Sequence, residues 1–189
     1  MITQLSFKQF NPSKPAKYGM LFRSINSSCR FPYTYTTAVY VGRPVGLPSN
    51  LCKYYVTGVE ETVKSLVRNL EKTTNLSGRN LSYDRLYTSI PLAQWLLERN
   101  ITSIGTIQAN RKGIPIEIKQ VENREVGSYK VFWNVAQKSM SLNSLIANSK
   151  SIGKQNILML STVKPVIGIP KDQKKNPALY KLNKITNKS

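Results

Sequence analysis

The sequence predicts an α/β fold with a mixed β-sheet. Segments that alternate in polarity, or that are rich in β-branched and aromatic residues, recur along the chain and are typical of strands. Two segments with apolar residues at helical spacing lie between them. The 189 residues, 40% of them hydrophobic, are enough for a domain with a buried core. Strands that alternate with helices favour a sheet with helices packed on its faces.

The first third of the chain predicts a β-hairpin followed by a helix. Residues 1–17 contain two prolines and are expected to be extended, whereas residues 18–26 and 33–41 have strand patterns. Residues 42–50 are rich in Gly and Pro and predict a loop. Apolar residues then recur at helical spacing from Val59 to Leu70, and Thr57 with Glu60 forms a capping-box pattern at the start of this helix.

The stretch from residue 78 to residue 115 predicts a strand, a turn, a helix, a second strand and a basic loop. The strands are expected at 80–84 and 101–107, and Ser89 is placed to cap a helix over residues 90–97. Asp84 stands where the first strand ends, which is where open α/β sheets place their functional sites. A single Asp is also a common turn residue, so both interpretations of Asp84 remain open at this point.

The last third predicts further strands and a basic end. Short strands that could pair as a hairpin are expected over residues 130–135 and 139–146, and a buried strand is expected over 156–163. Residues 114–125 have no clear pattern, residues 149–155 predict a basic loop, and residues 164–189 are rich in Lys, Asn and Pro. This region adds three strands to those predicted earlier in the chain.

The charge of the chain favours a polyanionic partner. Its 28 basic and 9 acidic residues give a net charge of +19, and the excess is spread along the chain. Nucleic acid is therefore the first candidate partner, and a solvated basic surface is the alternative. No apolar run reaches the length of a membrane helix and no signal peptide is visible, so we expect an intracellular protein without a membrane partner, in the nucleus rather than the cytoplasm. The candidate phosphate contacts are Arg111, Lys112, Lys150, Lys154, Lys174 and Lys175.

Several types of active site are disfavoured by the composition. The chain has no His, which excludes His-based acid–base catalysis and most zinc sites. Cys29 and Cys52 lack metal-ligand spacing and are expected to be buried thiols. Asp84 and Asp172 are the only two Asp residues, whereas a two-metal site for phosphoryl transfer needs several converging carboxylates.

A set of short motifs, in order along almost the whole chain, resembles the piggyBac-type transposases and the transposable-element-derived proteins of that family. The motifs are Lys-Pro-Ala-Lys-Tyr-Gly at 14–19, Tyr-Val-Gly-Arg at 40–43, the segment 78–93, Ile-Gly-Thr at 104–106, Asn-Arg-Lys-Gly-Ile-Pro at 110–115, Leu-Met-Leu-Ser-Thr at 158–162 and Lys-Asn-Pro-Ala-Leu-Tyr at 175–180. The resemblance implies an RNase H-like core over 18–113 and 156–163, a β-rich insertion over about 114–155 and a basic tail over 164–189.

The same resemblance implies a site that is incomplete. Active members of the family cut and rejoin DNA with Mg²⁺ ions held by three Asp, and Asp84 matches the second of them. No residue of this chain corresponds to the first, and the Gly-Gly-x-Asp motif that carries the third is absent after Thr186. One carboxylate is too few for two Mg²⁺ ions, so Asp84 is expected to be a vestigial ligand and no metal cofactor is expected here.

These observations lead us to expect a truncated, transposable-element-derived protein without transposase activity that retains some DNA binding. The first alternative is a co-opted DNA- or chromatin-binding module. The second is part of an active transposase, if the gene product is longer than this chain. Besides DNA, a full-length relative is a partner to consider.

Overall fold

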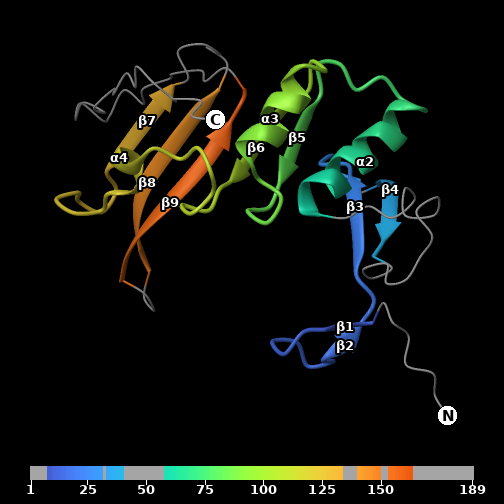
Figure 1. Cartoon of the computed structure of the whole chain (residues 1–189), viewed down its shortest axis with the longest axis horizontal. Helices are drawn as coiled ribbons and strands as arrows, with labels where there is room; N and C mark the ends of the chain where they lie inside the picture. Colours follow the sequence, from blue (N-terminus) through green and yellow to red (C-terminus); the bar gives the residue numbers. More distant parts are fainter. Residues whose placement is uncertain (1–7, 32, 41–57, 134–139, 150–152, 164–189) are drawn as a thin grey trace. The chain divides into compact units, whose positions relative to one another are not determined.

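The computed structural model describes residues 8–31, 33–40, 58–133, 140–149 and 153–163. The chain divides into two compact units, Met1–Asn75 and Leu76–Ser189, and each is described by itself. Figure 1 shows the helices and strands of both units. No helix in the described part of the chain is long and apolar enough to cross a membrane.

The first unit begins with two small antiparallel ribbons. Strand β1 (Gln9–Phe10) pairs with β2 (Tyr18–Gly19), and β3 (Phe22–Asn26) pairs with β4 (Thr34–Val39). The predicted hairpin is therefore present as β3 and β4. The start of the chain differs from the extended segment that we expected, because the chain turns at residues 11–16 and residues 9–10 pair back onto the start of the segment at 18–26.

Helix α2 (Val59–Glu71) completes the described part of this unit and buries the apolar stripe that its spacing predicts. The helix packs against β4, and Arg23 of β3 donates a hydrogen bond of 2.8 Å from Nη1 to Oγ1 of Thr62. The capping-box prediction is wrong. The N-cap is Gly58, whose φ of 91° favours glycine, and Glu60 consequently lies at the second helical position rather than the third.

The second unit is built on a five-stranded mixed sheet with the order β5-β6-β9-β8-β7, which confirms the predicted fold class at this level. Strand β5 (Asn80–Tyr83) runs parallel to β6 (Thr102–Thr106), and helix α3 (Ile90–Leu97) connects them. Strands β7 (Tyr129–Trp133), β8 (Ser141–Ser149) and β9 (Gly153–Ser161) are antiparallel to their neighbours, with β9 beside β6. The short helix α4 (Ile116–Lys119) precedes β7 and lies in residues 114–125, where the sequence has no clear pattern.

Strands β8 and β9 are longer than predicted. They pair without a break from Ser141 opposite Ser161 to Ser149 opposite Gly153, so only residues 150–152 remain between them. Most of the predicted basic loop at 149–155 is therefore strand, and Lys154 belongs to β9. Strands β7 and β8 share one sheet with β5, β6 and β9, and the division of the chain into a core and an insertion at about 114–155 stays a prediction.

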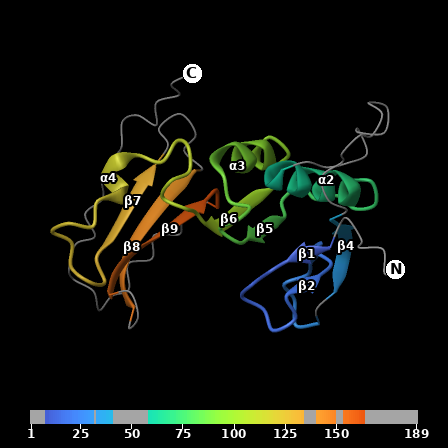
Figure 2. The same ribbon diagram turned by 60° about the horizontal axis from the view of Figure 1, so that its bottom comes forward.

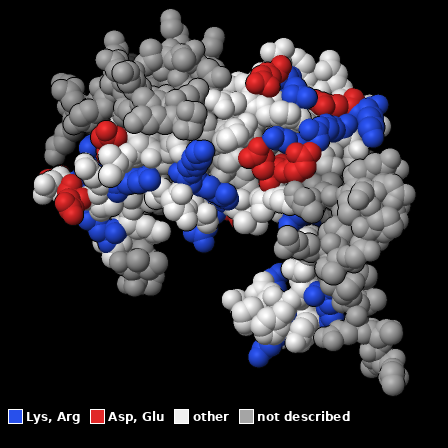
Figure 3. Space-filling model, viewed as in Figure 1, with Lys and Arg blue, Asp and Glu red and all other residues white. Residues whose placement is uncertain are grey.

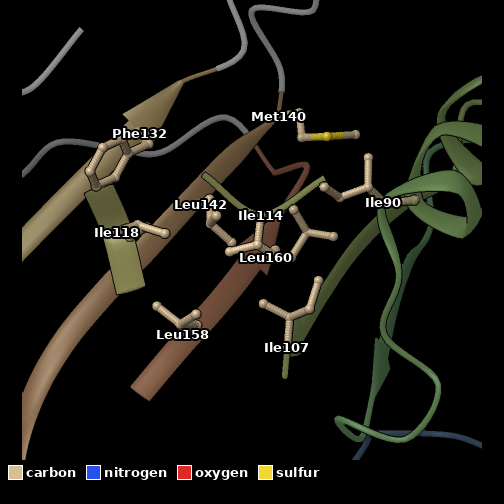
Figure 4. Close-up of a cluster of buried hydrophobic side chains, with 10 residues drawn as sticks. Ile90, Ile107, Ile114, Ile118, Phe132, Met140, Leu142, Leu158 and Leu160 are labelled. Atoms are coloured by element: carbon tan, nitrogen blue, oxygen red, sulfur yellow. The ribbon is translucent and has the colours of Figure 1, made fainter. Parts of the chain in front are cut away.

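One cluster of buried apolar side chains forms the core of this unit (Figure 4). Both α3 and α4 contribute to it, through Ile90 and Ile118, so the two helices cover the same face of the sheet, as Figure 2 also shows. Ala93 also comes from α3, Ile107 and Ile114 come from the loop that follows β6, and Met140 directly precedes β8. The remaining members lie in β7, β8 and β9; they are Phe132, Leu142, Leu158 and Leu160. The loop after β6 is thus fixed at both ends by buried isoleucines, and the residues between them lie at the edge where β5 and β6 end.

Candidate functional site

Asp84 follows β5 directly and its side chain is exposed. Because β5 and β6 are parallel, their carboxyl ends meet at one edge of the sheet, so the segment after β5 lies near the loop after β6. A contact shows this directly, since Nη2 of Arg111 donates a hydrogen bond of 2.7 Å to the carbonyl oxygen of Leu86. The structure therefore brings together the Asp84 turn and the basic loop that contains Arg111, which the sequence analysis identified separately.

The turn that begins at Asp84 is held mainly by its backbone carbonyl. That oxygen accepts hydrogen bonds from the N–H groups of Tyr87 and Thr88, at 2.9 and 3.2 Å, and from Oγ1 of Thr88 at 3.0 Å. The carboxylate accepts one more hydrogen bond, of 2.6 Å, from the N–H of Arg85 to Oδ1. Asp84 is thus a well-satisfied turn residue whose carboxylate also faces solvent.

Two neighbouring glycines allow the edge to be this tight. A Cβ atom on Gly105 of β6 would lie 2.6 Å from the carbonyl oxygen of Tyr83 and 2.6 Å from Oγ1 of Thr88. Gly113 has a φ of 86°, and a Cβ there would lie 3.0 Å from Cδ1 of Ile90. Gly105 therefore packs closely against the end of β5 and the Asp84 turn, and Gly113 of the basic loop packs closely against Ile90 at the start of α3.

The start of α3 fixes the far side of the turn as the sequence predicts. Ser89 is the N-cap, and its Oγ accepts a hydrogen bond of 3.2 Å from the N–H of Leu92. Pro91 lies in the first turn, where its missing N–H costs little. Leu92 is fully buried, which anchors this end of the helix in the protein interior.

A metal site is not formed by the residues that the structure describes. Among them, no group of three or more Asp, Glu or Cys side chains lies close enough together to hold a metal ion. Divalent Mg²⁺ takes six oxygen ligands and needs more than one carboxylate in two-metal sites. Asp84 alone does not meet that requirement, and Asp172 lies outside the described residues.

The predicted phosphate contacts are only partly brought together. Lys112 is exposed beside Arg111, whose guanidinium is half-buried and binds the Leu86 carbonyl, so Arg111 holds the loop. Lys154 is exposed on β9. Figure 3 shows basic side chains along this unit with acidic ones between them. Lys150, Lys174 and Lys175 lie outside the described residues.

The predictions from the sequence left out one exposed cation near Asp84 and were wrong about one cysteine. Arg85 is exposed directly after Asp84, and its position in the segment 78–93 was the available signal. Cys29 is exposed, which corrects the expectation of a buried thiol, because it lies in the turn between β3 and β4 rather than in a strand. Cys52 lies outside the described residues.

Comparison with known proteins agrees with the motifs. A family model described as "Transposase IS4" matches residues 1–184. A cryo-EM structure of the piggyBac transposase synaptic complex with hairpin DNA is similar to this chain, with a TM-score of 0.68 and 27% identity over 88% of the chain. No curated protein matches it. The family model and the structural similarity together confirm the resemblance to piggyBac-type transposases. The chain spans 31% of the length of that transposase chain.

Proposed function

We propose, from the premise that the chain belongs to the IS4-type transposase family, that it binds DNA through its basic surface and does not by itself cut or rejoin DNA. The similar piggyBac transposase was determined as a complex with hairpin DNA, which supports DNA as the class of partner. The net charge of +19 supports the same partner on independent grounds. For its location we propose the nucleus rather than the cytoplasm, on the ground of the proposed DNA partner.

The observation that carries the proposal is the lone carboxylate at the carboxyl edge of β5. Asp84 lies at the end of a strand with a parallel neighbour, as a ligand of an RNase H-like core would. Yet among the described residues no group of three or more Asp, Glu or Cys side chains that could hold a metal ion includes it. A mechanism in which two metal ions activate the attacking oxygen and stabilise the leaving one therefore has no basis in this set of residues.

The proposed DNA contacts are the exposed cations near this edge, Arg85 and Lys112, together with Lys154 on β9. Lys and Arg contacts to phosphates fix the position of a protein on DNA and carry no sequence information. Each phosphate that is neutralised adds about 0.9 to the slope of log K against log salt. We therefore expect binding that is weak, independent of sequence and steeply dependent on salt.

The experiment measures duplex binding by the full chain across a salt series. The double variant Arg85→Gln/Lys112→Gln should lower the salt slope by roughly 2, whereas Lys64→Gln should leave it unchanged. Lys64 is the matched control because it forms an ion pair of 2.7 Å with Glu60 on α2, away from this edge in the sequence and in the other unit. Equal slopes for all three proteins would contradict the proposed contacts.

The second half of the experiment tests cleavage and strand transfer with Mg²⁺ or Mn²⁺, with Asp84→Ala alongside. We expect neither activity from the wild-type chain. Cleavage that disappears in Asp84→Ala would show that a complete site forms from ligands outside the described residues, and would refute this part of the proposal. Salt-sensitive binding without cleavage favours the co-opted binding module, and the absence of both favours a transposon remnant.

A second candidate function rests on the length of the chain. Because it spans only 31% of the similar transposase chain, a longer protein that contains it could supply the missing carboxylates. In that case the Asp84 edge would be one part of an active, Mg²⁺-dependent transposase. The size of the endogenous protein on an immunoblot distinguishes the two cases, since a protein much larger than 21.3 kDa would favour the longer form.

A further inference from the structure

The β1–β2 ribbon presents two aromatic rings to solvent. Phe10 and Tyr18 are opposite each other in the antiparallel register, with ring centroids 5.1 Å apart and an interplanar angle of 51°. The side chains are 57% and 54% exposed, although large aromatic residues are usually buried. Two adjacent rings that remain this accessible on a ribbon of two-residue strands call for an explanation other than the packing of a core.

The ribbon that carries these rings is rich in cations, one of which lies over the Tyr18 ring. Nζ of Lys8 lies 5.0 Å from the centre of the Tyr18 ring, and Lys14 and Lys17 are exposed on the same ribbon. The sequence contains no Asp or Glu before Glu60. In Figure 3 the part of the molecule formed by the first strands shows basic side chains and no acidic ones. The ribbon is therefore both aromatic and positively charged.

The turn between the two strands gives this surface a defined shape. The N–H of Asn11 donates to the carbonyl of Lys17 at 2.7 Å, and the Asn11 side chain accepts from the N–H of Ser13 at 3.1 Å. Pro12 and Pro15 restrict the backbone between these contacts. The motif Lys-Pro-Ala-Lys-Tyr-Gly at 14–19 therefore forms the second half of this ribbon. The function proposed for the Asp84 edge does not involve this motif.

We propose that residues 8–19 bind single-stranded nucleic acid, with bases stacked on Phe10 and Tyr18 and phosphates at Lys14 and Lys17. An unpaired nucleotide combines an exposed flat base with a negative charge, and both features match this surface. A duplex offers only the charge, because its bases are stacked on each other. The inference concerns a different surface from the Asp84 edge and stands whether or not that edge binds duplex DNA.

The experiment compares the full chain with single and double ring variants. Binding to oligo(dT) and to a duplex of equal length is measured by fluorescence anisotropy at one salt concentration. We expect the wild-type chain to prefer the single strand, and Phe10→Leu/Tyr18→Leu to weaken oligo(dT) binding roughly tenfold to a hundredfold while duplex binding changes less than twofold. Leucine keeps the apolar bulk and removes the aromatic face.

Two controls separate stacking from other effects. Phe10→Trp keeps a face for stacking and should retain oligo(dT) binding, whereas Tyr129→Leu removes an exposed aromatic ring of the other unit and should have no effect on it. Circular dichroism of every variant checks that the secondary structure is kept. A variant that loses it is replaced by the corresponding single substitution.

Three results would overturn the proposal. The first is equal affinity for single strand and duplex with no effect of the leucine variants, which would mean that charge alone binds. The second is no binding of oligo(dT). The third is a change in oligomeric state of the leucine variants without a change in affinity, which would mean that the rings form a protein contact. An unchanged salt slope of duplex binding in Arg85→Gln/Lys112→Gln, with the oligo(dT) preference intact, would refute the proposed duplex contacts alone.

Discussion

Replacement of Gly105 by Ala should destabilise the sheet at the Asp84 edge more than a typical single substitution. The added Cβ would lie 2.6 Å from the carbonyl oxygen of Tyr83, 2.6 Å from Oγ1 of Thr88 and 2.7 Å from Cδ2 of Tyr83. Overpacking costs about 1–3 kcal/mol when neighbours can move, and here one neighbour is backbone that belongs to the β5–β6 ladder. The Thr88 hydroxyl can move only by giving up its hydrogen bond to Asp84, which adds about 1 kcal/mol.

The expected loss in free energy of unfolding is therefore about 3 kcal/mol, measured by urea denaturation followed by circular dichroism. Hydrogen exchange gives a local readout, because the amides of Tyr87 and Thr88 should exchange faster once the turn is displaced. Gly19→Ala is the matched control, since a Cβ there meets nothing within 4 Å. A loss below about 0.5 kcal/mol for Gly105→Ala would refute the close packing of β5 on β6.

Three further outcomes follow from single contacts. Arg111→Lys keeps the charge but loses the geometry of the contact to the Leu86 carbonyl, so limited proteolysis should cut the Asp84 turn faster while the salt slope of DNA binding stays the same. Thr162→Val should lower the free energy of unfolding by about 1–3 kcal/mol, because the buried Thr162 hydroxyl accepts the Ser103 N–H at 2.7 Å, and Thr162→Ser should not. Burial raises the pKa of Tyr129, so the stability it contributes is present below its ordinary pKa of about 10 and is lost as pH rises through the folded-state value. Tyr129→Phe should therefore make the fall in stability above about pH 10 shallower.

The elements that the sequence predicted well are those set by local patterns. Helix α3 needs only its apolar spacing, the cap from Ser89 and a residue that tolerates positive φ at its end, and Asn100 has a φ of 57°. The capping box at Thr57 failed because a second local preference competed with it. Gly58 adopts a φ that other residues avoid, which moves the N-cap by one residue.

The errors arose where main-chain pairing decides the structure. Residues 149–155 have a loop-like composition, yet Ser149 and residues 153–155 belong to the β8–β9 ladder, because the ladder uses backbone groups whatever the side chain. The position of Asp84 at a strand end was predictable from its own segment. The contact of Arg111 with Leu86 was not, because it depends on β5 and β6 being parallel neighbours, which no single segment encodes.

Most residues of the Asp84 edge are explained by stability alone, and this allows the two interpretations of Asp84 to be separated. The backbone carbonyl makes three of the four hydrogen bonds at this residue, and the side chain accepts only the Arg85 N–H. Asn provides the same acceptor oxygen without the charge. Asp84→Asn should therefore change the free energy of unfolding by less than about 0.5 kcal/mol, whereas Asp84→Ala removes the acceptor and should cost more.

The same substitution tests the carboxylate as a ligand. Because the described residues contain no group of three or more side chains that could hold a metal ion, the wild-type chain should bind Mn²⁺ no more tightly than Asp84→Asn does in isothermal titration calorimetry. If DNA phosphates pass this edge, removal of the negative charge should strengthen DNA binding slightly at low salt. Tight Mn²⁺ binding that is lost in Asp84→Asn at unchanged stability would mean that further ligands reach Asp84, and the proposal that this chain cannot cut DNA would then be wrong.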